Sequence, residues 1–314
     1  MIYFDNAATT FPKPPSVRRA VIRAMEAYGA NPGRGGHRMS LQTAREVFLC
    51  RQTAAELFGA PDEEHVIFTA NATASLNVAI RGLLQDGGRA VVSDLEHNAV
   101  MRPLHALSPK RPVYDVAAVT PEDDDATLAA FEAAITPQTK AIVCTHASNV
   151  FGITLPVRRI GELARRHAIP LVVDASQSAG LIPIDMERDH IDYLCLPGHK
   201  GLYGPMGTGL LICGKGRTLP PLILGGTGTR SRSFDQPDDL PDRLESGTLN
   251  VPGICGLRAG MAFVKRQGVE ALAGREREGL KAFYEKLLNC KGIRLYSNTA
   301  RLDRGVPLLS LTVD

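Results

Sequence analysis

Residues 140–174 read KAIVCTHASNVFGITLPVRRIGELARRHAIPLVVD. Two short apolar runs, 140–146 and 170–174, flank a segment, 157–167, in which apolar residues recur at helical spacing. A strand, a helix and a second strand in this order form the crossover unit that joins parallel neighbours in a sheet. The stretch therefore predicts an α/β fold built around a mostly parallel sheet.

The same alternation continues on both sides of this stretch. Strands are predicted at 65–70, 90–94 and 112–116, and helices at 73–84 and 126–135. Two later apolar runs, 193–196 and 209–213, have no room for a helix between them, so we expect an antiparallel return there.

The last third of the sequence changes character. Residues 222–249 are rich in Gly, Ser, Asp, Arg and Pro and predict a long functional loop. One long helix is then expected from 251 to 288, followed by strands at 292–296 and 306–313. The sequence ends at Asp314 directly after an apolar run, so we expect a final domain that is incomplete in this chain.

Composition favours a globular chain without nucleic-acid or membrane partners. The 314 residues are 44% hydrophobic, enough for one large domain and a smaller one. The formal net charge is only +3 and no long basic run occurs, so we expect no nucleic-acid partner. We see no apolar stretch long enough to span a membrane and no signal peptide at the start, and these absences predict a cytoplasmic protein.

Six cysteines are scattered through the chain without a Cys-x-x-Cys pair or zinc-finger spacing, so we expect no metal site. Cys144, Cys195 and Cys213 lie in apolar, strand-like runs. We interpret these three as small buried side chains in a reducing compartment.

Several polar residues follow the predicted strands, where open α/β sheets bind their ligands. Asp174, Asn149 and His146 follow the two strands of the opening stretch, and His97 and Thr73 follow earlier ones. This clustering predicts a small-molecule site. Lys200 lies nearby in a glycine-rich turn, GHKGLYGPMGTG. A solvated lysine is the simplest interpretation of such a turn, and a Walker phosphate loop does not match because Gly-Lys-Ser/Thr is absent.

Eight ordered motifs together resemble the cysteine desulfurase and selenocysteine lyase family, enzymes of aminotransferase class V that depend on pyridoxal 5′-phosphate (PLP). The motifs are YFDNAATT (3–10), NPGRGGH (31–37), FTANATASLN (68–77), EHNAV (96–100), HASN (146–149), VDASQ (173–177), GHK (198–200) and ESGTLN (245–250). The resemblance implies PLP-dependent transferase fold type I. The expected domains are a PLP-binding large domain at 16–259 and a smaller α+β domain made of 1–15 and 260–314.

The resemblance also implies catalytic roles. Lys200 is similar to the lysine that forms a Schiff base with PLP and later moves the substrate α-proton. Asp174 resembles the carboxylate that keeps the PLP ring nitrogen protonated, although a helix cap is an alternative. His97 resembles the residue that stacks on the ring and acts as acid or base, although a structural histidine is more common.

Further cofactor contacts follow from the same resemblance. Gln177 and Asn149 resemble residues near the phenolic oxygen of the ring, and a turn-stabilising role is the alternative for both. The backbone at Ala72 and Thr73, together with His199, is expected at the phosphate. The family often has a phosphate-binding serine where this chain has Pro197, so some contact must be replaced.

Thr248 resembles a residue that reaches the phosphate of the other subunit, which implies a homodimer. Arg34 and His37 resemble a loop at the substrate entrance, but a solvated basic loop is an equal alternative.

The implied reaction converts L-cysteine to L-alanine, leaving a persulfide on an enzyme cysteine for a sulfur-acceptor protein in iron–sulfur or thiolation pathways. None of the six cysteines lies in the family's nucleophile motif, so we expect that thiol beyond Asp314. The alternatives are a selenocysteine lyase, another class V aminotransferase-like enzyme, or a truncated PLP-binding protein without activity.

Overall fold

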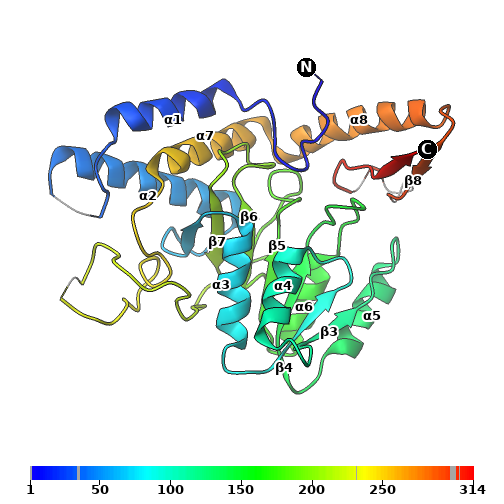
Figure 1. Cartoon of the computed structure of the whole chain (residues 1–314), viewed down its shortest axis with the longest axis horizontal. Coiled ribbons are helices and arrows are strands. Elements are labelled where there is room, and N and C mark those ends of the chain that lie inside the picture. Colours follow the sequence, from blue (N-terminus) through cyan, green and yellow to red (C-terminus); the bar gives the residue numbers. More distant parts are fainter. Residues whose placement is uncertain (1, 34–35, 231, 298–301, 304) are drawn as a thin grey trace.

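The computed structural model describes residues 2–33, 36–230, 232–297, 302–303 and 305–314. Its centre is a seven-stranded sheet in the order β1-β7-β6-β5-β4-β2-β3 (Figure 1). The strands are β1 (Val66–Thr69), β2 (Arg89–Ser93), β3 (Tyr114–Ala117), β4 (Thr139–Thr145), β5 (Leu171–Asp174), β6 (Tyr193–Pro197) and β7 (Gly209–Cys213). All five strands expected before residue 193 are present, within a few residues of the predicted limits.

The sheet is parallel except for one strand. β7 pairs antiparallel with both β6 and β1, whereas β2, β3, β4, β5 and β6 pair parallel with their neighbours. The predicted antiparallel return is therefore confirmed. A consequence is that β1, β2, β4, β5 and β6 all end at the same edge of the sheet.

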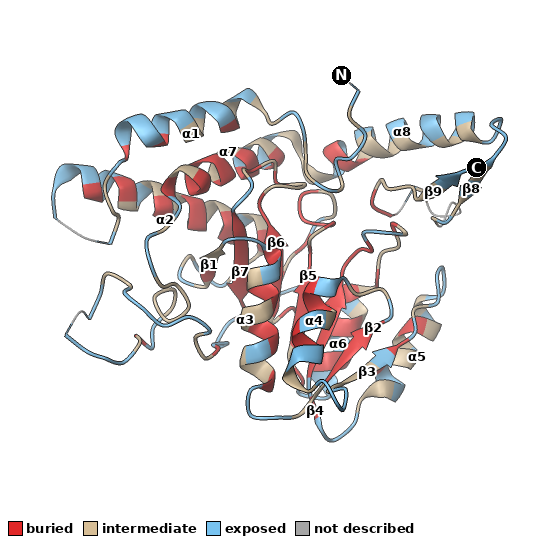
Figure 2. Cartoon of the chain, viewed as in Figure 1, coloured by how far each residue is buried: buried red, intermediate tan, exposed pale blue. Residues whose placement is uncertain are grey.

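Helices cover both faces of this sheet. The helices are α3 (Ala72–Leu84) and α4 (Asn98–Leu107) on one face, and α2 (Arg38–Phe58), α5 (Asp124–Ala134), α6 (Val157–Arg166) and α7 (Val251–Gln267) on the other. Figure 2 shows the buried residues concentrated in the strands and in the helix surfaces that face them. Each face has its own apolar cluster, because strand side chains alternate between the two sides. The predicted α/β fold with a mostly parallel sheet is confirmed.

The single long helix expected at 251–288 is wrong. α7 ends at Gln267 and a second helix, α8 (Val269–Leu287), begins two residues later. Gly268 lies between them with a φ of 83°, a left-handed conformation that glycine adopts without a steric penalty. The helical spacing of apolar residues continues from α7 into α8, so the sequence pattern alone does not show that two separate helices form.

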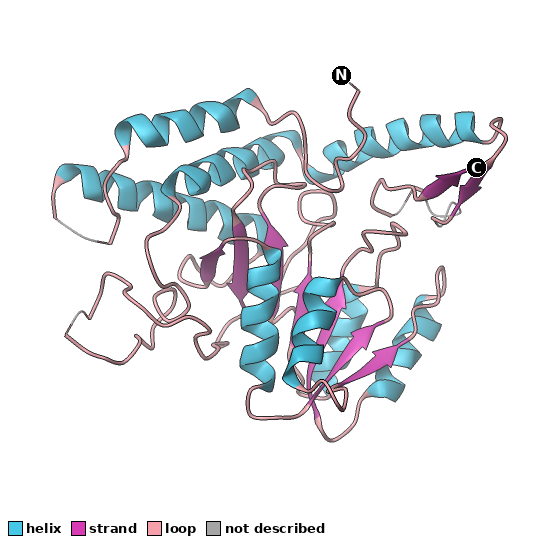
Figure 3. Ribbon diagram, in the orientation of Figure 1, coloured by secondary structure: helices cyan, strands magenta, loops and turns pink. Residues whose placement is uncertain are grey.

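The remaining elements lie outside the central layers. α1 (Pro15–Ala27), for which we made no prediction, packs along α7. β8 (Ile293–Leu295) and β9 (Leu311–Val313) form a separate antiparallel pair, so the strand expected at 306–313 is much shorter than predicted. Residues 222–249 contain no helix or strand among those described (Figure 3). In the described part of the chain, no helix is long and apolar enough to cross a membrane.

Candidate active site at the strand ends

Asp174 ends β5 at the centre of the sheet edge, and its side chain is only 2% exposed. The Ser176 N–H donates a hydrogen bond of 2.9 Å to Asp174 Oδ1. Burial raises the pKa of this carboxyl, while the Ser176 hydrogen bonds and the nearby charges of Lys200 and His97 act to lower it. The structure thus brings together the three residues expected to act on the cofactor.

Lys200 lies in the turn after β6, next to the strand that ends at Asp174. Burial lowers the pKa of its amine, and the nearby Asp174 opposes that shift. Within the described residues, Lys200 Nζ forms no hydrogen bond or ion pair, whereas its carbonyl accepts bonds from Tyr203 N at 2.8 Å and Thr10 Oγ1 at 2.7 Å. The backbone is therefore fixed while the amine is left available, as a nucleophile or base requires.

The N-terminal segment holds this turn in place. Thr10 N donates to His199 O at 3.1 Å, and Lys13 Nζ donates to the same oxygen at 2.6 Å. The His199 ring shares a hydrogen bond of 3.1 Å with Thr9 Oγ1, so it is occupied by protein contacts. The Gln177 amide likewise donates to Ala7 O at 3.1 Å. The sequence does not indicate this role for Thr9 and Thr10, because no local pattern encodes a contact 190 residues away.

His97 is the N-cap of α4. Its Nδ1 accepts a hydrogen bond of 3.0 Å from Ala99 N. A ring nitrogen that accepts carries no proton, so the proton of the neutral imidazole lies on Nε2. The ring therefore presents a hydrogen-bond donor on its free side.

The N-terminus of α3 has the features of an anion site. Asn71 caps the helix by accepting a hydrogen bond of 2.9 Å from Ala74 N. The N–H groups of Ala72 and Thr73 have no hydrogen-bond partner in the part of the chain that is described. Gly209 of β7 lies directly behind this turn, where a Cβ would stand 2.6 Å from the Asn71 carbonyl carbon. Free N–H groups at a helix start bind phosphate well.

The other residues predicted for the site differ in their exposure and side-chain contacts. Asn149 and Thr248 are exposed and form no side-chain hydrogen bond among the described residues. His146 is buried with Nδ1 unpartnered, and burial lowers its pKa to about 4. Pro197 is the last residue of β6 and is buried. His37 caps α2 through a 3.4 Å contact with Ser40 N, and Arg34 lies outside the described residues.

Glu96 is a residue whose importance the sequence did not reveal. It stands in a quoted motif next to His97, yet its carboxyl turns inward and accepts a hydrogen bond of 2.8 Å from Thr145 N at the end of β4. Burial raises its pKa to about 8. Charged residues in a loop are ordinarily solvated, so only the three-dimensional structure shows that the carboxyl of this half-buried residue is shielded from water.

Five of the six thiols are unsuited to accept sulfur. Cys50, Cys144, Cys195, Cys213 and Cys255 are buried, and burial raises the pKa of each, so little thiolate is present at neutral pH. The interpretation of Cys144, Cys195 and Cys213 as buried side chains is confirmed. Cys290, after α8, is exposed.

We expect a water-soluble disulfide reagent to react rapidly with one thiol of the native chain. Replacing Cys290 with serine should abolish that rapid phase, while Cys255→Ser should leave it unchanged. Absorbance of the released chromophore would measure both. A rapid phase that survives in Cys290→Ser would contradict the assignment.

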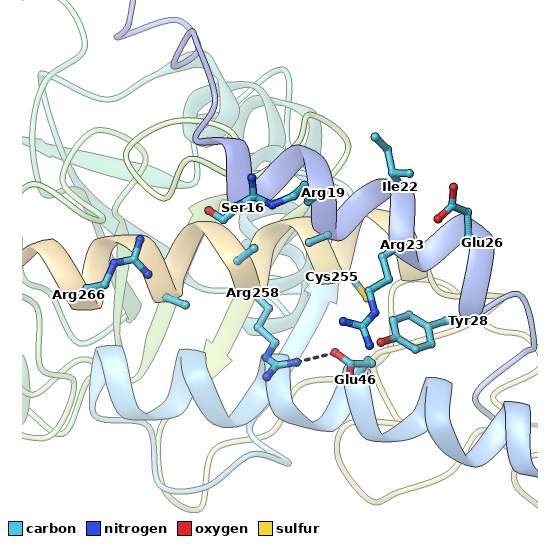
Figure 4. A pocket seen from close by; sticks show the side chains of 13 residues that line it. Ser16, Arg19, Ile22, Arg23, Glu26, Tyr28, Glu46, Cys255, Arg258 and Arg266 are labelled. Atoms are coloured by element: carbon cyan, nitrogen blue, oxygen red, sulfur yellow. Dashed lines mark hydrogen bonds and ion pairs between the residues drawn. The ribbon is translucent and has the colours of Figure 1, made fainter.

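A groove of about 810 Å³ lies elsewhere, between α1 and α7 above α2 (Figure 4). Arg258 and Glu46 form an ion pair of 2.5 Å across its floor, and Arg23 lies over the Tyr28 ring. None of the residues predicted for catalysis or cofactor binding lines this groove. Although this groove is large, we therefore do not identify it as the candidate active site.

Comparisons with known proteins point to one family. Residues 2–313 match the family model described as aminotransferase class-V. A probable cysteine desulfurase of Methanothermobacter thermautotrophicus is 31% identical over 303 residues, covering 95% of this chain and 75% of that protein. The apo structure of a cysteine desulfurase from Thermococcus onnurineus NA1 superposes with a TM-score of 0.89 at 31% identity, covering 99% of this chain and 78% of that one. SspA, solved in complex with cysteine, gives a TM-score of 0.80 at 28% identity, covering 100% and 84%.

Proposed function

Because the chain belongs to the aminotransferase class-V family, we propose that it is a PLP-dependent cysteine desulfurase. The reaction would convert L-cysteine and a thiol to L-alanine and a persulfide. The observation that carries the proposal is the placement of Lys200, Asp174 and His97 after strands that end at one edge of the sheet, with Lys200 and His97 both near enough to act electrostatically on Asp174. The bound cysteine of SspA supports the choice of substrate.

The residues at this edge fit PLP. Asp174 is a buried carboxylate that contacts no cation among the residues the structure describes, and the protonated ring nitrogen of PLP would supply one. The free N–H groups at the start of α3 would hold the phosphate. Lys200 has the unpaired amine that covalent attachment of the aldehyde requires.

When bound, PLP supplies an electron sink for the bond that breaks at the substrate α-carbon. Lys200 Nζ would take the α-proton and return it, and the lowered pKa of its amine favours the neutral form that can accept a proton. Asp174 would keep its negative charge against the ring nitrogen. His97 would donate from Nε2, since its Nδ1 is held by the Ala99 N–H.

The sulfur would pass to a thiol other than the five buried ones, because a thiolate must reach the substrate sulfur. The acceptor thiol forms the new S–S bond while the substrate carbon–sulfur bond breaks, and the carbon product takes up a proton to become alanine.

The decisive experiment adds L-cysteine to the PLP-loaded protein and follows both alanine and the visible absorption band of the cofactor. We expect the band to shift and alanine to form. Accumulation of pyridoxamine phosphate would indicate an aminotransferase instead, and faster alanine release from selenocysteine would indicate a selenocysteine lyase. A band that does not respond to cysteine would contradict the proposal.

We also propose a homodimer with active sites at its interface. Thr248 is exposed, as a residue that serves the partner subunit would be in a single chain. Exposed large apolar side chains occur on α2 and at the start of the 222–249 loop: Met39, Leu41, Phe48, Leu222, Ile223 and Leu224. Apolar side chains of this kind are typical of protein interfaces.

Three further points are also proposed. The unpaired cysteines support a location in the reducing cytoplasm, and the product persulfide would serve a sulfur-acceptor protein in iron–sulfur or thiolation pathways. The division into a large domain at 16–259 and a small domain made of 1–15 and 260–314 places one boundary inside α7.

A further inference from the structure

Glu96 attaches the loop between β2 and α4 to the end of β4, whereas Asp94 of the same loop bonds to Ala117 O and Val119 N at the end of β3, on the other side of β2. Glu96 Oε1 accepts hydrogen bonds from Thr145 N at 2.8 Å and from Ser93 Oγ at 2.5 Å. Ser93 ends β2 and Thr145 ends β4, so one oxygen joins the ends of two adjacent strands. His97 is the next residue in the chain, and its position follows from where this loop is held.

The other oxygen of the same carboxyl is in an unusual position. Glu96 Oε2 is buried and has no hydrogen-bond partner among the described residues. Asp174 lies close enough for its charge to act on Glu96. Two ionised carboxylates in such surroundings would repel one another, and an unpaired buried charge is costly. Burial raises the pKa of Glu96 to about 8, which favours the uncharged acid.

We propose that Glu96 is a positioning residue for His97, which it fixes at the cofactor site by clamping the β2–α4 loop to the end of β4. To form the clamp, the side chain at 96 must be long enough to contact Thr145 N and must carry a carbonyl-type acceptor. It does not need a negative charge. An uncharged Glu96 would also leave Asp174 as the carboxylate at the proposed cofactor site. This inference rests on the proposed function only where it concerns PLP, because the clamp is made entirely by residues of the chain.

Two substitutions separate the effect of side-chain length at Glu96 from the effect of its charge. Glu96→Gln keeps the length of the side chain and a neutral acceptor for Thr145 N. Glu96→Asp keeps the carboxyl but is one methylene shorter, so it cannot span the distance to β4 without moving the loop. We expect Glu96→Gln to bind PLP within about threefold of the wild type, and Glu96→Asp to bind it at least about tenfold more weakly.

The second measurement does not involve the cofactor. In apo-protein labelled with 15N-histidine, the shifts of the two ring nitrogens report the tautomer, and the signal that disappears in His97→Gln identifies His97. We expect the tautomer with the proton on Nε2 in the wild type and in Glu96→Gln. In Glu96→Asp we expect averaging between tautomers, because the N-cap geometry is no longer held.

Each outcome bears on the proposal. If Glu96→Gln keeps the PLP affinity and the His97 tautomer while Glu96→Asp loses both, the proposal is supported. If both variants keep them, if both lose them, or if only Glu96→Gln loses them, the proposal is overturned. If the wild type failed to bind PLP while the His97 tautomer still depended on the residue at 96, the proposed function would fail and the positioning role would stand.

Discussion

Replacing Lys200 with alanine is expected to abolish covalent attachment of PLP and to lower the rate of alanine release by roughly 10³-fold, the scale of a lost general base. The same amine would attach the cofactor and move the α-proton, so one substitution removes both functions. The measurement is the intact mass after borohydride reduction, which increases by one reduced cofactor per chain in the wild type. In the variant we expect no increase.

Lys13 provides the matched control, because its amine also lies in this region. Burial lowers its pKa to about 8, so it would be a plausible attachment site on reactivity alone. Its Nζ, however, donates to His199 O at 2.6 Å, whereas Lys200 Nζ has no hydrogen bond among the described residues. We expect Lys13→Ala to retain the mass increase. Attachment that persists in Lys200→Ala and is lost in Lys13→Ala would overturn the assignment.

The fold could be predicted where local patterning decides the structure. The buried strands β4 and β5 are short apolar runs, and their ends locate Asp174 without further information. The break at Gly268 was missed because a glycine within a helical pattern is often tolerated, and only its φ of 83° shows the turn. The limits of β9 were missed because an apolar run does not show where strand pairing begins.

The site could be predicted only in part, for a related reason. Lys200, Asp174 and His97 belong to motifs, and the structure brings them together. The contacts that hold them in place connect distant parts of the chain. Thr10 reaches Lys200 across 190 residues, and Glu96 reaches Thr145 across 49. No periodicity encodes such pairs, because they depend on which strands become neighbours in the sheet.

The loop at 222–249 is anchored by a contact of the same long-range kind. Arg51 of α2 donates to both oxygens of Glu245 at 2.8 and 2.7 Å, and the two side chains are only 9% and 8% exposed. Arg51 also donates to Val66 O and lies over the Phe68 ring at 4.5 Å, while Phe68 N donates to Glu245 Oε1 at 2.6 Å. The pair thus fixes the loop to β1, three residues before Thr248.

Glu245→Ala is expected to lower the free energy of unfolding by about 3–5 kcal/mol, because it leaves the Arg51 guanidinium buried without its counter-charge. Urea unfolding followed by circular dichroism would measure the change. Glu56→Ala is the control: its ion pair with Lys265 is 47–55% exposed, and we expect a loss of no more than about 1 kcal/mol. The double variant Arg51→Met/Glu245→Met should recover much of the stability, because it removes both buried charges. Equal losses from Glu245→Ala and Glu56→Ala would show that the buried pair does not anchor the loop.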